Sequence, residues 1–537
     1  MAQLILVLIG ALLVTALARK REIAAPLLLV AVGMVVSLVP GLDELHIDPE
    51  LLLTVVLPPL LYAAALDSSF TNFRQRIRAI VHHGVLQVIA TSLVLGWIAF
   101  LLIPDLPLAS AIVLGAVIAP PDAVTAAAVG RQLNLPRGVM TVLGGESLIN
   151  DAAALTIYRM AITAAVGTTP TLAQGLWVFA LAVVVGVVVG LGFGMLAQLA
   201  RQHVPDVQVA TLLGVLVPFI AYLTAEELGG SGVLAVVTAG LYVGHNLPRA
   251  RAAGRLQEHT VWGAINLLLE SLVFAFIGLQ LKSVISDVLE AGHPMGGIVV
   301  ATLLILAATM AFRVLWMFAS NFLPGVSHLI RSTRQRGSRW RRTAVLSWAG
   351  MRGVVTLAAA GAVPLTTGTG APLPGREVIQ LVAAVVTVGT ILLQGTTLPP
   401  LIRRLGVTDP EEDREDDHAE AEARRIATNA ALAYLDGLTP AEAHCDRSSL
   451  DRMVARMREM VEDQGKAAAE QVGRTPAERA DTSTRTFSEL RRNVLDVQRS
   501  AIADERDAGH LDDVVLRRVL RELDLQEAAV ESSWRNR

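Results

Sequence analysis

The sequence predicts an all-α polytopic membrane protein with about thirteen transmembrane helices, followed by a charged helical tail. Hydrophobic residues make up 53% of the 537-residue chain and charged residues only 17%, whereas about a quarter of the residues in a typical soluble protein are charged. Apolar runs recur up to about residue 404, each long enough to cross a hydrocarbon core of roughly 30 Å. No such run follows residue 405.

The chain therefore divides into a membrane domain, residues 1–404, and a tail, residues 405–537. The charge changes at the same boundary. The tail holds 30 acidic and 20 basic residues, a net charge of −10, and the membrane domain holds 18 and 25, a net charge of +7; the sum is the −3 of the whole chain. The single cysteine, Cys445, lies in the tail, so an intrachain disulfide is excluded.

The expected spans are apolar segments joined by short polar connections. They lie at about residues 2–18, 23–40, 50–66, 80–103, 107–129, 138–165, 171–200, 206–225, 231–247, 258–281, 294–322, 343–364 and 377–402. The first has no basic residue before it and is followed by Arg19, Lys20 and Arg21. That order is typical of a first transmembrane helix and not of a signal peptide.

Basic residues in the connections predict the orientation of the chain. One alternate set of connections holds twenty Lys and Arg residues, and the other set holds only Lys282 and Arg376. Because cytoplasmic loops carry the excess of basic residues, we expect the N-terminus outside the cell membrane and the tail in the cytoplasm. The basic residues follow these loops, so the sequence gives no support for binding nucleic acid.

The tail contains several segments rich in Ala, Leu, Arg and Glu that are typical of helices, and "TPAEA" and "TPAER" mark two helix starts. It has no catalytic or nucleotide-binding signature. A solvated helical appendage and a regulatory or dimerising element are both open interpretations.

Six charged residues lie well inside the expected spans, where the membrane penalises them by about 2.5–3.5 kcal/mol each on insertion scales. They are Asp122, Glu146, Asp151, Glu270, Arg313 and Arg352. Each is a candidate for a functional site or for a structural ion pair.

Asp122 follows two prolines in "VIAPPDAVTAAAVG". Pro120 and Pro121 remove two backbone donors, so carbonyls near Ala116 and Val117 lose their helical partners. Such backbone is tolerated at membrane depth only where protein or a wet cavity satisfies it, and discontinuous helices mark the binding sites of transporters. Freed carbonyls beside a carboxylate suit a small cation. The alternative is a simple proline kink, which does not require a neighbouring Asp.

"GGESLINDAAALTIY", residues 144–158, holds two carboxylates and an asparagine. Glu146 and Asn150 are four residues apart and share a helix face, as do Ser147 and Asp151. Glu146 and Asp151 are five apart and point about 140° away from each other. One acid can therefore pair structurally while the other faces a cavity. Burial and a nearby Asp122 both favour a protonated carboxylate, so Asp151 is suited to carry either a proton or a cation.

Arg352 lies in "SWAGMRGVVTLAAAG" between Gly350 and Gly353, which suggests a break or close packing. An arginine cannot lose its charge and needs a partner, for which we expect Glu146 in a bidentate pair. The segments 107–129 and 343–364 are both interrupted and both precede a long helix, which hints at an inverted repeat.

These stretches resemble the monovalent cation:proton antiporter-1 family, the bacterial Na⁺/H⁺ exchangers related to animal sodium/proton exchangers. The resemblance covers residues 1–404 in order and spacing. It rests on "LPPLLYAA" at 57–64, "APPDAV" at 119–124, "GGESLINDAAAL" at 144–155, "LVFAFIGLQL" at 272–281 and "WAGMRGVVTLA" at 348–358. The Gly-Glu-Ser-x-x-Asn-Asp element at 145–151 together with the Met-Arg-Gly element is specific, whereas the Pro-Pro elements alone are weak.

The resemblance implies a homodimeric antiporter that moves an ion by alternating access. It implies that Asp151 binds the cation and the proton, that Asp122 and Ser147 belong to the Na⁺ site, and that Asn150 replaces a second acid, as in electroneutral exchangers. It also implies a Glu146–Arg352 pair. We expect no cofactor and no enzymatic activity, only transported Na⁺ and H⁺, with a role in intracellular pH and sodium homeostasis.

Three departures from the family pattern concern ion selectivity. Pro121 stands where a Thr is common, which removes a hydroxyl ligand, and Ala63 stands where many members have an acid. Glu270 and Ser271 precede "LVF" where an Asn is common. Glu270 is expected either to pair with Arg313 or to replace the acid absent at Ala63.

The leading hypothesis is exchange of Na⁺, or of K⁺ or Li⁺, for H⁺ across the cell membrane. An intramembrane aspartyl protease using Asp122 and Asp151 fits poorly, because prolines precede one acid and Asn150 the other. A cation channel is the third hypothesis. A site that holds one ion or one proton within broken helices favours a carrier.

Overall fold

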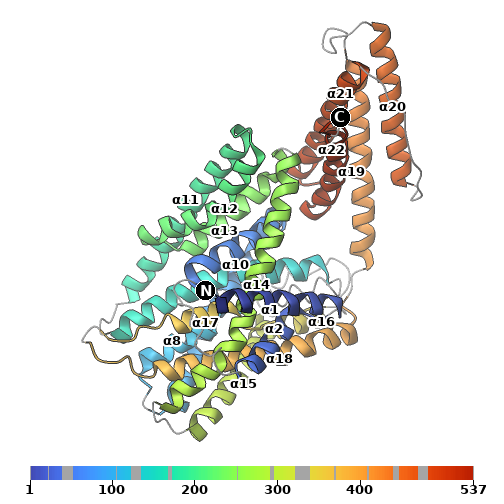
Figure 1. Ribbon diagram of the computed structural model, residues 1–537. Helices are drawn as coiled ribbons and strands as arrows, with labels where there is room; N and C mark the ends of the chain where they lie inside the picture. The colour runs from blue at the N-terminus through green and yellow to red at the C-terminus, as the bar shows by residue number, and fades with distance from the viewer. Residues whose placement is uncertain are drawn as a thin grey trace. The chain divides into compact units, whose positions relative to one another are not determined.

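The computed structural model describes the chain as an all-helical protein (Figure 1). It describes residues 2–21, 23–38, 52–104, 106–122, 135–166, 172–250, 252–290, 295–320, 339–367, 370–407, 410–438, 447–469 and 482–535. Within these ranges there is no β-strand, only an isolated bridge between Thr366 and Pro372. The predicted fold class is confirmed in this respect.

The chain forms two compact units. The first comprises Met1–Ala200, Leu212–Gly244 and Thr260–Thr408. The second comprises Arg201–Thr211, His245–His259 and Asp409–Arg537, so the tail shares a unit with two connecting segments.

The helices of the long apolar region run in this order: α1 (Ala2–Lys20), α2 (Ala25–Val36), α4 (Leu57–Asp67), α5 (Phe70–Gln75), α6 (Ile77–Val81), α7 (Gln87–Leu102), α8 (Leu108–Ile118), α10 (Arg137–Val166), α11 (Leu172–His203), α12 (Val207–Glu227), α13 (Gly232–Asn246), α14 (Ala252–Glu290), α15 (Met295–Ser320), α16 (Arg339–Trp348), α17 (Val354–Gly361) and α18 (Arg376–Leu405). Short π-helical turns, η1 (Leu52–Val56) and η2 (His82–Leu86), precede α4 and α7, and a 3₁₀ turn, η3 (Leu247–Arg249), follows α13.

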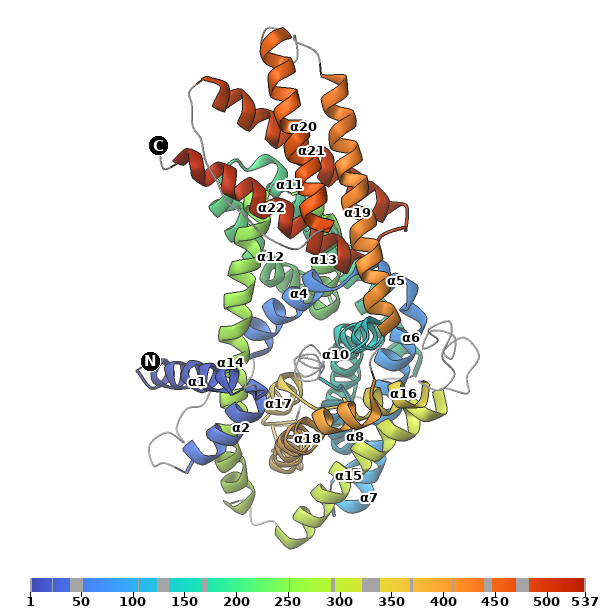
Figure 2. The same cartoon turned by 90° about the vertical axis from the view of Figure 1, so that its right-hand side faces the viewer.

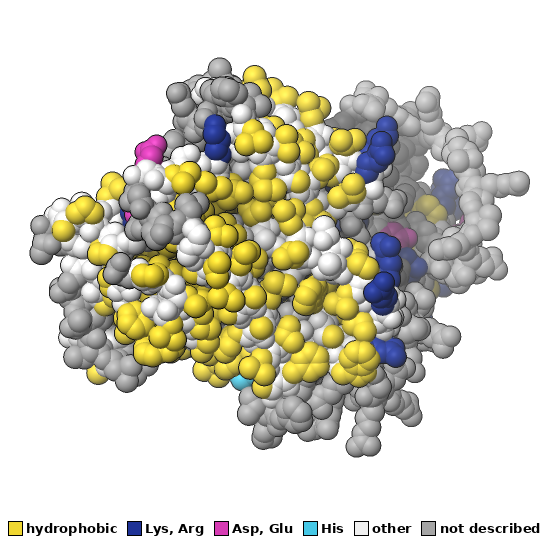
Figure 3. Space-filling view, turned by 90° about the horizontal axis from the view of Figure 1, so that it is seen from below, with side chains coloured by type: hydrophobic (Ala, Val, Ile, Leu, Met, Phe, Trp, Pro, Cys, Tyr) yellow, Lys and Arg dark blue, Asp and Glu magenta, His cyan; other side chains and the backbone are white. Residues whose placement is uncertain are grey.

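Six helical segments among the described residues are long and apolar enough to cross a membrane: Ile77–Leu102, Ala173–His203, Val207–Glu227, Gln257–Glu290, Gly296–Ser320 and Arg376–Leu405. Four shorter apolar helices accompany them: Ala25–Val36, Thr54–Asp67, Leu108–Ile118 and Gly232–Asn246. Large hydrophobic side chains such as Trp97, Trp177 and Leu315 are exposed, and Figure 3 shows a face dominated by hydrophobic side chains. These features suit a lipid environment, while the expected count of thirteen spans stays a prediction.

Two helices are interrupted where the sequence predicts it. Helix α8 ends at Ile118, directly before the two prolines, and the chain is non-helical from Pro120 to Asp122. Helix α16 ends at Trp348, and α17 begins only at Val354. Both breaks are explained by residues that cannot continue or do not favour a helix, proline in one and glycine in the other. The second part of the first interrupted segment, 123–134, lies outside the described residues.

The interrupted helices lie next to long, continuous ones. Helix α8 contacts α10, α17 and α18, and α17 also contacts α18. Figure 2 shows these four helices gathered together. The two chain breaks are therefore held between α10 and α18, which fixes where their exposed backbone groups point.

The described residues of the tail form four amphipathic helices: α19 (Pro410–Gly437), α20 (Arg447–Ala469), α21 (Thr482–Asp507) and α22 (Asp513–Arg535). Helices α19, α21 and α22 share a core that includes Ala427, Ile502 and Leu516. Helices α19, α20 and α21 share a smaller one that includes Leu435 and Met457. Although the tail is rich in charged residues, its helices thus pack around hydrophobic cores as a folded bundle.

Helices α2 and α14 approach each other closely at two glycines. A Cβ atom on Gly278 would lie 2.5 Å from the carbonyl oxygen of Val30 and 2.8 Å from the Cα atom of Gly33. Both neighbours are backbone atoms, so they cannot move aside as a flexible side chain would. Glycine is required there because small residues let helix backbones pack together in membranes.

We predict that Gly278→Ala lowers the thermal stability of the purified protein, by roughly 1–3 kcal/mol, as overpacking of a core usually does. Gly263→Ala, in the same helix α14, is the matched control, because nothing lies within 4 Å of a Cβ atom there. Thermal unfolding in detergent measures both. Equal stabilities for the two variants would contradict this packing.

Candidate ion-binding site

The two interrupted segments bind each other through one backbone–backbone hydrogen bond and one hydrogen bond from a side chain to the backbone. The amide of Asp122 donates a hydrogen bond to the carbonyl oxygen of Met351 at 2.7 Å. The Nε of Arg352 donates to the carbonyl oxygen of Ile118, also at 2.7 Å. The two breaks therefore supply partners for each other's exposed backbone, which is the condition for non-helical chain at membrane depth.

Arg352 holds this junction together. It is 1% exposed, and in addition to Ile118 it binds the carbonyl oxygen of Gly350 through Nη1 at 2.5 Å. Its own amide donates to Oγ1 of Thr390 on α18 at 2.9 Å. The guanidinium group thus supplies donors to carbonyls of both broken segments and connects them to a continuous helix.

The two glycines beside Arg352 make room for other charged side chains. A Cβ atom on Gly353 would collide with the carboxylate of Asp122, and one on Gly350 would collide with the side chain of Arg313. Both glycines are therefore sites of close packing, as the sequence predicts. The Gly353 contact places the Asp122 carboxylate against the break between α16 and α17.

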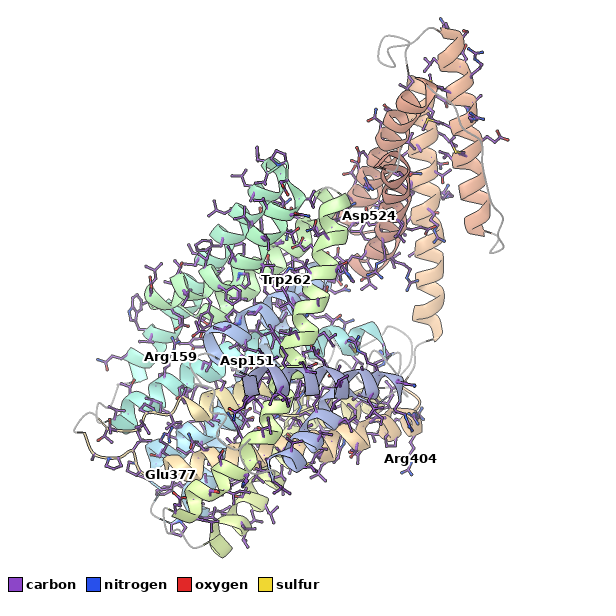
Figure 4. All side chains as sticks on the ribbon, in the orientation of Figure 1. Asp151, Arg159, Trp262, Glu377, Arg404 and Asp524 are labelled. Atoms are coloured by element: carbon purple, nitrogen blue, oxygen red, sulfur yellow. The ribbon has the colours of Figure 1, made fainter. Side chains whose placement is uncertain are left out.

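Helix α10 brings the second acid to the same region. Asp151 is 6% exposed and Asn150 is fully buried, and Asp122 is close enough to Asp151 to interact with it electrostatically. Figure 4 shows Asp151 among the helices of the first unit. Ser147, one helical turn earlier, is partly buried. Asp151 and Asp122 are thus two neighbouring acids, the first buried and the second half-buried.

Asn150 connects α10 to the first break. Its Nδ2 donates a hydrogen bond to the carbonyl oxygen of Pro121 at 2.5 Å. Its Oδ1 is buried and has no hydrogen-bond partner among the described residues. The amide therefore fixes the break with one end and presents an oxygen with the other, and oxygen atoms are the ligands that hard cations prefer.

The structure corrects the partner expected for Glu146. Glu146 does not pair with Arg352 but with Arg313 on α15, in a bidentate arrangement with distances of 2.5 and 3.1 Å. Both side chains are 2% exposed. The expected role of Arg352 as the partner was wrong because the carbonyls of the broken segments, which a sequence pattern does not locate, take up its donors.

Arg313, which was expected as a partner of Glu270, binds a different acid. The carboxylate that Arg313 binds is that of Glu146, and its remaining hydrogen bond goes to the carbonyl oxygen of Leu346 at 3.3 Å. Glu270 lies partly buried on α14. Glu146 and Arg313 were therefore both expected to form ion pairs, but each was expected to do so with a different partner.

Two features of the site were not predicted. Thr390 gives the amide of Arg352 its partner, although nothing in its apolar helix distinguishes it from other threonines. His83, in the π-helical turn η2, is 1% exposed and lies within electrostatic range of Glu146 and Arg313. A π-helical turn often marks a functional site, and two adjacent histidines at a span boundary were a usable signal.

Comparisons with known proteins agree on the family. A family model described as "Sodium/hydrogen exchanger, transmembrane" matches residues 5–404. The chain therefore belongs to the sodium/hydrogen exchanger family of membrane transporters.

Similar proteins include an uncharacterized Na⁺/H⁺ exchanger of Mycobacterium tuberculosis, 35% identical over 97% of this chain and 95% of that protein. A sodium, potassium, lithium and rubidium/H⁺ antiporter of Bacillus pumilus is 32% identical over 71% of this chain and 58% of that protein. The structure of the sodium proton antiporter MjNhaP1 from Methanocaldococcus jannaschii has the same fold, with a TM-score of 0.57 at 20% identity, over 75% of this chain and 96% of that one.

We predict that Glu146→Gln and Arg313→Gln each destabilise the protein by about 3–5 kcal/mol, because each leaves a buried charge without its partner. The double variant is expected to lose less than the sum of the two. Arg159→Gln is the control, because Arg159 is half exposed in its pair with Glu226 and such pairs contribute about 0–1 kcal/mol. Additive losses in thermal unfolding would contradict a direct Glu146–Arg313 interaction.

Proposed function

We propose that the protein exchanges Na⁺ for H⁺ by alternating access, with Asp151 as the acid that carries each in turn. The observation that carries the proposal is the pair of acids, Asp151 and Asp122, held near each other where two broken helices cross. Membership of the sodium/hydrogen exchanger family supports the same reaction.

The chemistry follows from the cost of holding a buried carboxylate, Asp151, next to a half-buried one, Asp122. Both carboxylates can be ionised at once only if a cation lies with them, and without one the lower-energy state has a proton on one of them. Binding of a cation and binding of a proton are therefore mutually exclusive. A carrier that changes its access only in one of these two loaded states exchanges the ions against each other.

The cation would be held by oxygen atoms from two chain segments, the first break and α10. Asp122 supplies a carboxylate from the first break, and Asp151 and Ser147 supply oxygens one turn apart on α10. The buried Oδ1 of Asn150 is a further candidate. Pro121 supplies no hydroxyl group, and its carbonyl oxygen is occupied by Asn150.

We also propose that the exchange is electroneutral. Asn150 cannot titrate, and its Nδ2 is committed to Pro121, so Asp151 is the acid of α10 that changes its charge at the site. One proton per monovalent cation then leaves the net charge of the site the same in both loaded states.

A second candidate is K⁺/H⁺ exchange by the same site. The Bacillus pumilus relative is named for sodium, potassium, lithium and rubidium, and the Pro121 and Ala63 departures remove oxygen ligands that would favour one ion. Comparing exchange driven by Na⁺, K⁺ and Li⁺ at one concentration decides between the two candidates.

The orientation and assembly are also proposals. The connecting segments Arg201–Thr211 and His245–His259 share a compact unit with the tail, which supports a location of all three on the same side of the membrane. Both belong to the set of connections rich in arginine, which supports a cytoplasmic tail in the cell membrane and an N-terminus outside. A membrane domain at 1–404, a tail at 405–537 and a homodimer are proposed on the sequence resemblance.

We predict that Asp151→Asn abolishes cation-driven proton movement in proteoliposomes that contain a pH-sensitive dye, because an amide neither titrates nor attracts a cation as a carboxylate does. Glu377→Gln, at the start of α18, makes the same chemical change outside the site and is expected to leave the rate within about twofold. Full exchange by Asp151→Asn would contradict the assignment of the carrier acid.

A further inference from the structure

Thr356, in the first turn of α17, has a buried hydroxyl group that the surrounding chain does not satisfy. The side chain is 1% exposed, and its Oγ1 has no hydrogen-bond partner among the described residues. Burying a hydroxyl group without a partner costs free energy. Such a group is stabilised by a ligand that binds its oxygen atom.

Buried threonines elsewhere in the long helices satisfy their hydroxyl groups within their own helix. Thr309 of α15, for example, donates to the carbonyl oxygen of Ile305 at 2.7 Å. The corresponding acceptor for Thr356 would be the carbonyl group of Arg352, four residues earlier. That residue lies in the break before α17, where the chain is not helical. The break that interrupts the helix thus leaves the Thr356 hydroxyl group available for another ligand.

The neighbouring residues of α17 show which face of the helix carries this threonine. Ala359 and Ala360, three and four residues after Thr356, belong to the hydrophobic cluster that includes the buried residues of α8, and α17 contacts α8 directly. Gly353, three residues before Thr356, lies against the carboxylate of Asp122. Residues three and four apart share a helix face. Thr356 therefore lies on the face of α17 that turns toward the first break, one turn from the Asp122 contact.

Helix α17 also approaches α10 at the level of the proposed cation ligands. Val355, the residue before this threonine, packs against a hydrophobic cluster that includes Leu148 and Ala152 of α10. These two residues directly follow Ser147 and Asp151 in the sequence. The first turn of α17 thus lies between the two segments that supply the proposed ligands.

A hydroxyl oxygen at this position suits a monovalent cation. Oxygen atoms are the ligands that hard cations prefer, and a hydroxyl group adds one without adding a charge. The first break supplies a carboxylate at Asp122 but no hydroxyl group at Pro121. A neutral ligand also leaves the proposed balance of one proton per cation unchanged.

We propose that Thr356 is a further ligand of the transported cation and that its hydroxyl oxygen favours the smaller cations. The proposal rests on the exchange function proposed above and adds the second broken segment to the ligand set. A cation bound in this way is held from both breaks and from α10. Because a smaller ion approaches each oxygen more closely and is attracted more strongly, Thr356 increases the affinity for Na⁺ and Li⁺ more than the affinity for K⁺.

The test compares Thr356→Val with Thr356→Ser in the full-length protein, reconstituted in proteoliposomes that contain a pH-sensitive dye. Valine has nearly the same shape and lacks the oxygen, whereas serine keeps it. We expect Thr356→Val to raise the Na⁺ concentration at half-maximal rate at least about fivefold and to leave the maximal rate within about twofold. Thr356→Ser is expected to stay within about twofold of the wild type in both values.

Two further measurements separate a ligand from a structural residue. Titration calorimetry with Na⁺ measures the dissociation constant without transport, and we expect it to rise in Thr356→Val by the same factor. The rise is expected to be larger for Na⁺ and Li⁺ than for K⁺. Thr309→Val is the control, because it removes a buried hydroxyl group that is bonded within its own helix. It is expected to leave the dissociation constants and their order unchanged.

An unchanged half-maximal concentration and dissociation constant in Thr356→Val would overturn the assignment of Thr356 as a ligand. Equal rises in Thr356→Val and Thr356→Ser, or an equal rise in Thr309→Val, would also overturn it, because the hydroxyl oxygen would not be the cause. If Thr356→Val does not fold, Thr356→Ala replaces it with the same expected results, because it removes the same oxygen from a helix already rich in alanine.

The wild type distinguishes a failure of this inference from a failure of the proposed function. A wild-type chain that does not exchange cations for protons would overturn the proposed function, and the inference with it. A wild-type chain that exchanges them, beside a Thr356→Val variant with unchanged values, would overturn the inference alone.

Discussion

The fold of the transport region depends on the meeting of two broken helices around Arg352. Breaking a helix inside a membrane exposes backbone groups, each of which costs several kcal/mol if left without a partner. Here each broken segment supplies hydrogen-bond partners for the other. The amide of Asp122 donates to the carbonyl oxygen of Met351, and the guanidinium group of Arg352 donates to the carbonyl oxygen of Ile118. Asn150 and Thr390 connect this junction to α10 and α18. The junction is thus a polar structure that the surrounding apolar helices can enclose.

The buried charges of this region have different surroundings. Glu146 and Arg313 neutralise each other in a buried bidentate pair. The guanidinium group of Arg352 donates hydrogen bonds to backbone carbonyl oxygens. Asp151 differs from these residues, because the charged group acting on it is a second carboxylate, that of Asp122. A buried acid next to a second acid is stabilised by a proton or a cation. The environment that a membrane protein usually avoids is therefore the one that an exchanger requires.

The sequence was sufficient for the features that follow from local rules. Paired prolines before Asp122 predicted the end of α8, glycines beside Arg352 predicted the second break, and helix periodicity separated the faces of Glu146 and Asp151. It was insufficient for the choice among buried partners. The sequence pointed to Arg352 as the partner of Glu146, whereas the structure pairs Glu146 with Arg313, because the carbonyl oxygens of the breaks occupy Arg352. The hydrogen bond from Arg255 of α14 to Asp524 of α22 joins residues 269 positions apart, and no local sequence pattern predicts it.

The proposed exchange requires that one site binds either a cation or a proton. Calorimetric titration of the purified protein with Na⁺, in buffers of different ionisation enthalpy, measures the protons released as the cation binds, since a ligand acid must lose its proton to hold the ion. About one proton is expected to be released per Na⁺ bound near the pH at which Asp151 titrates. The Asp151→Asn variant is expected to release no proton. Binding of Na⁺ to the wild type without proton release at any pH would contradict the proposed exchange.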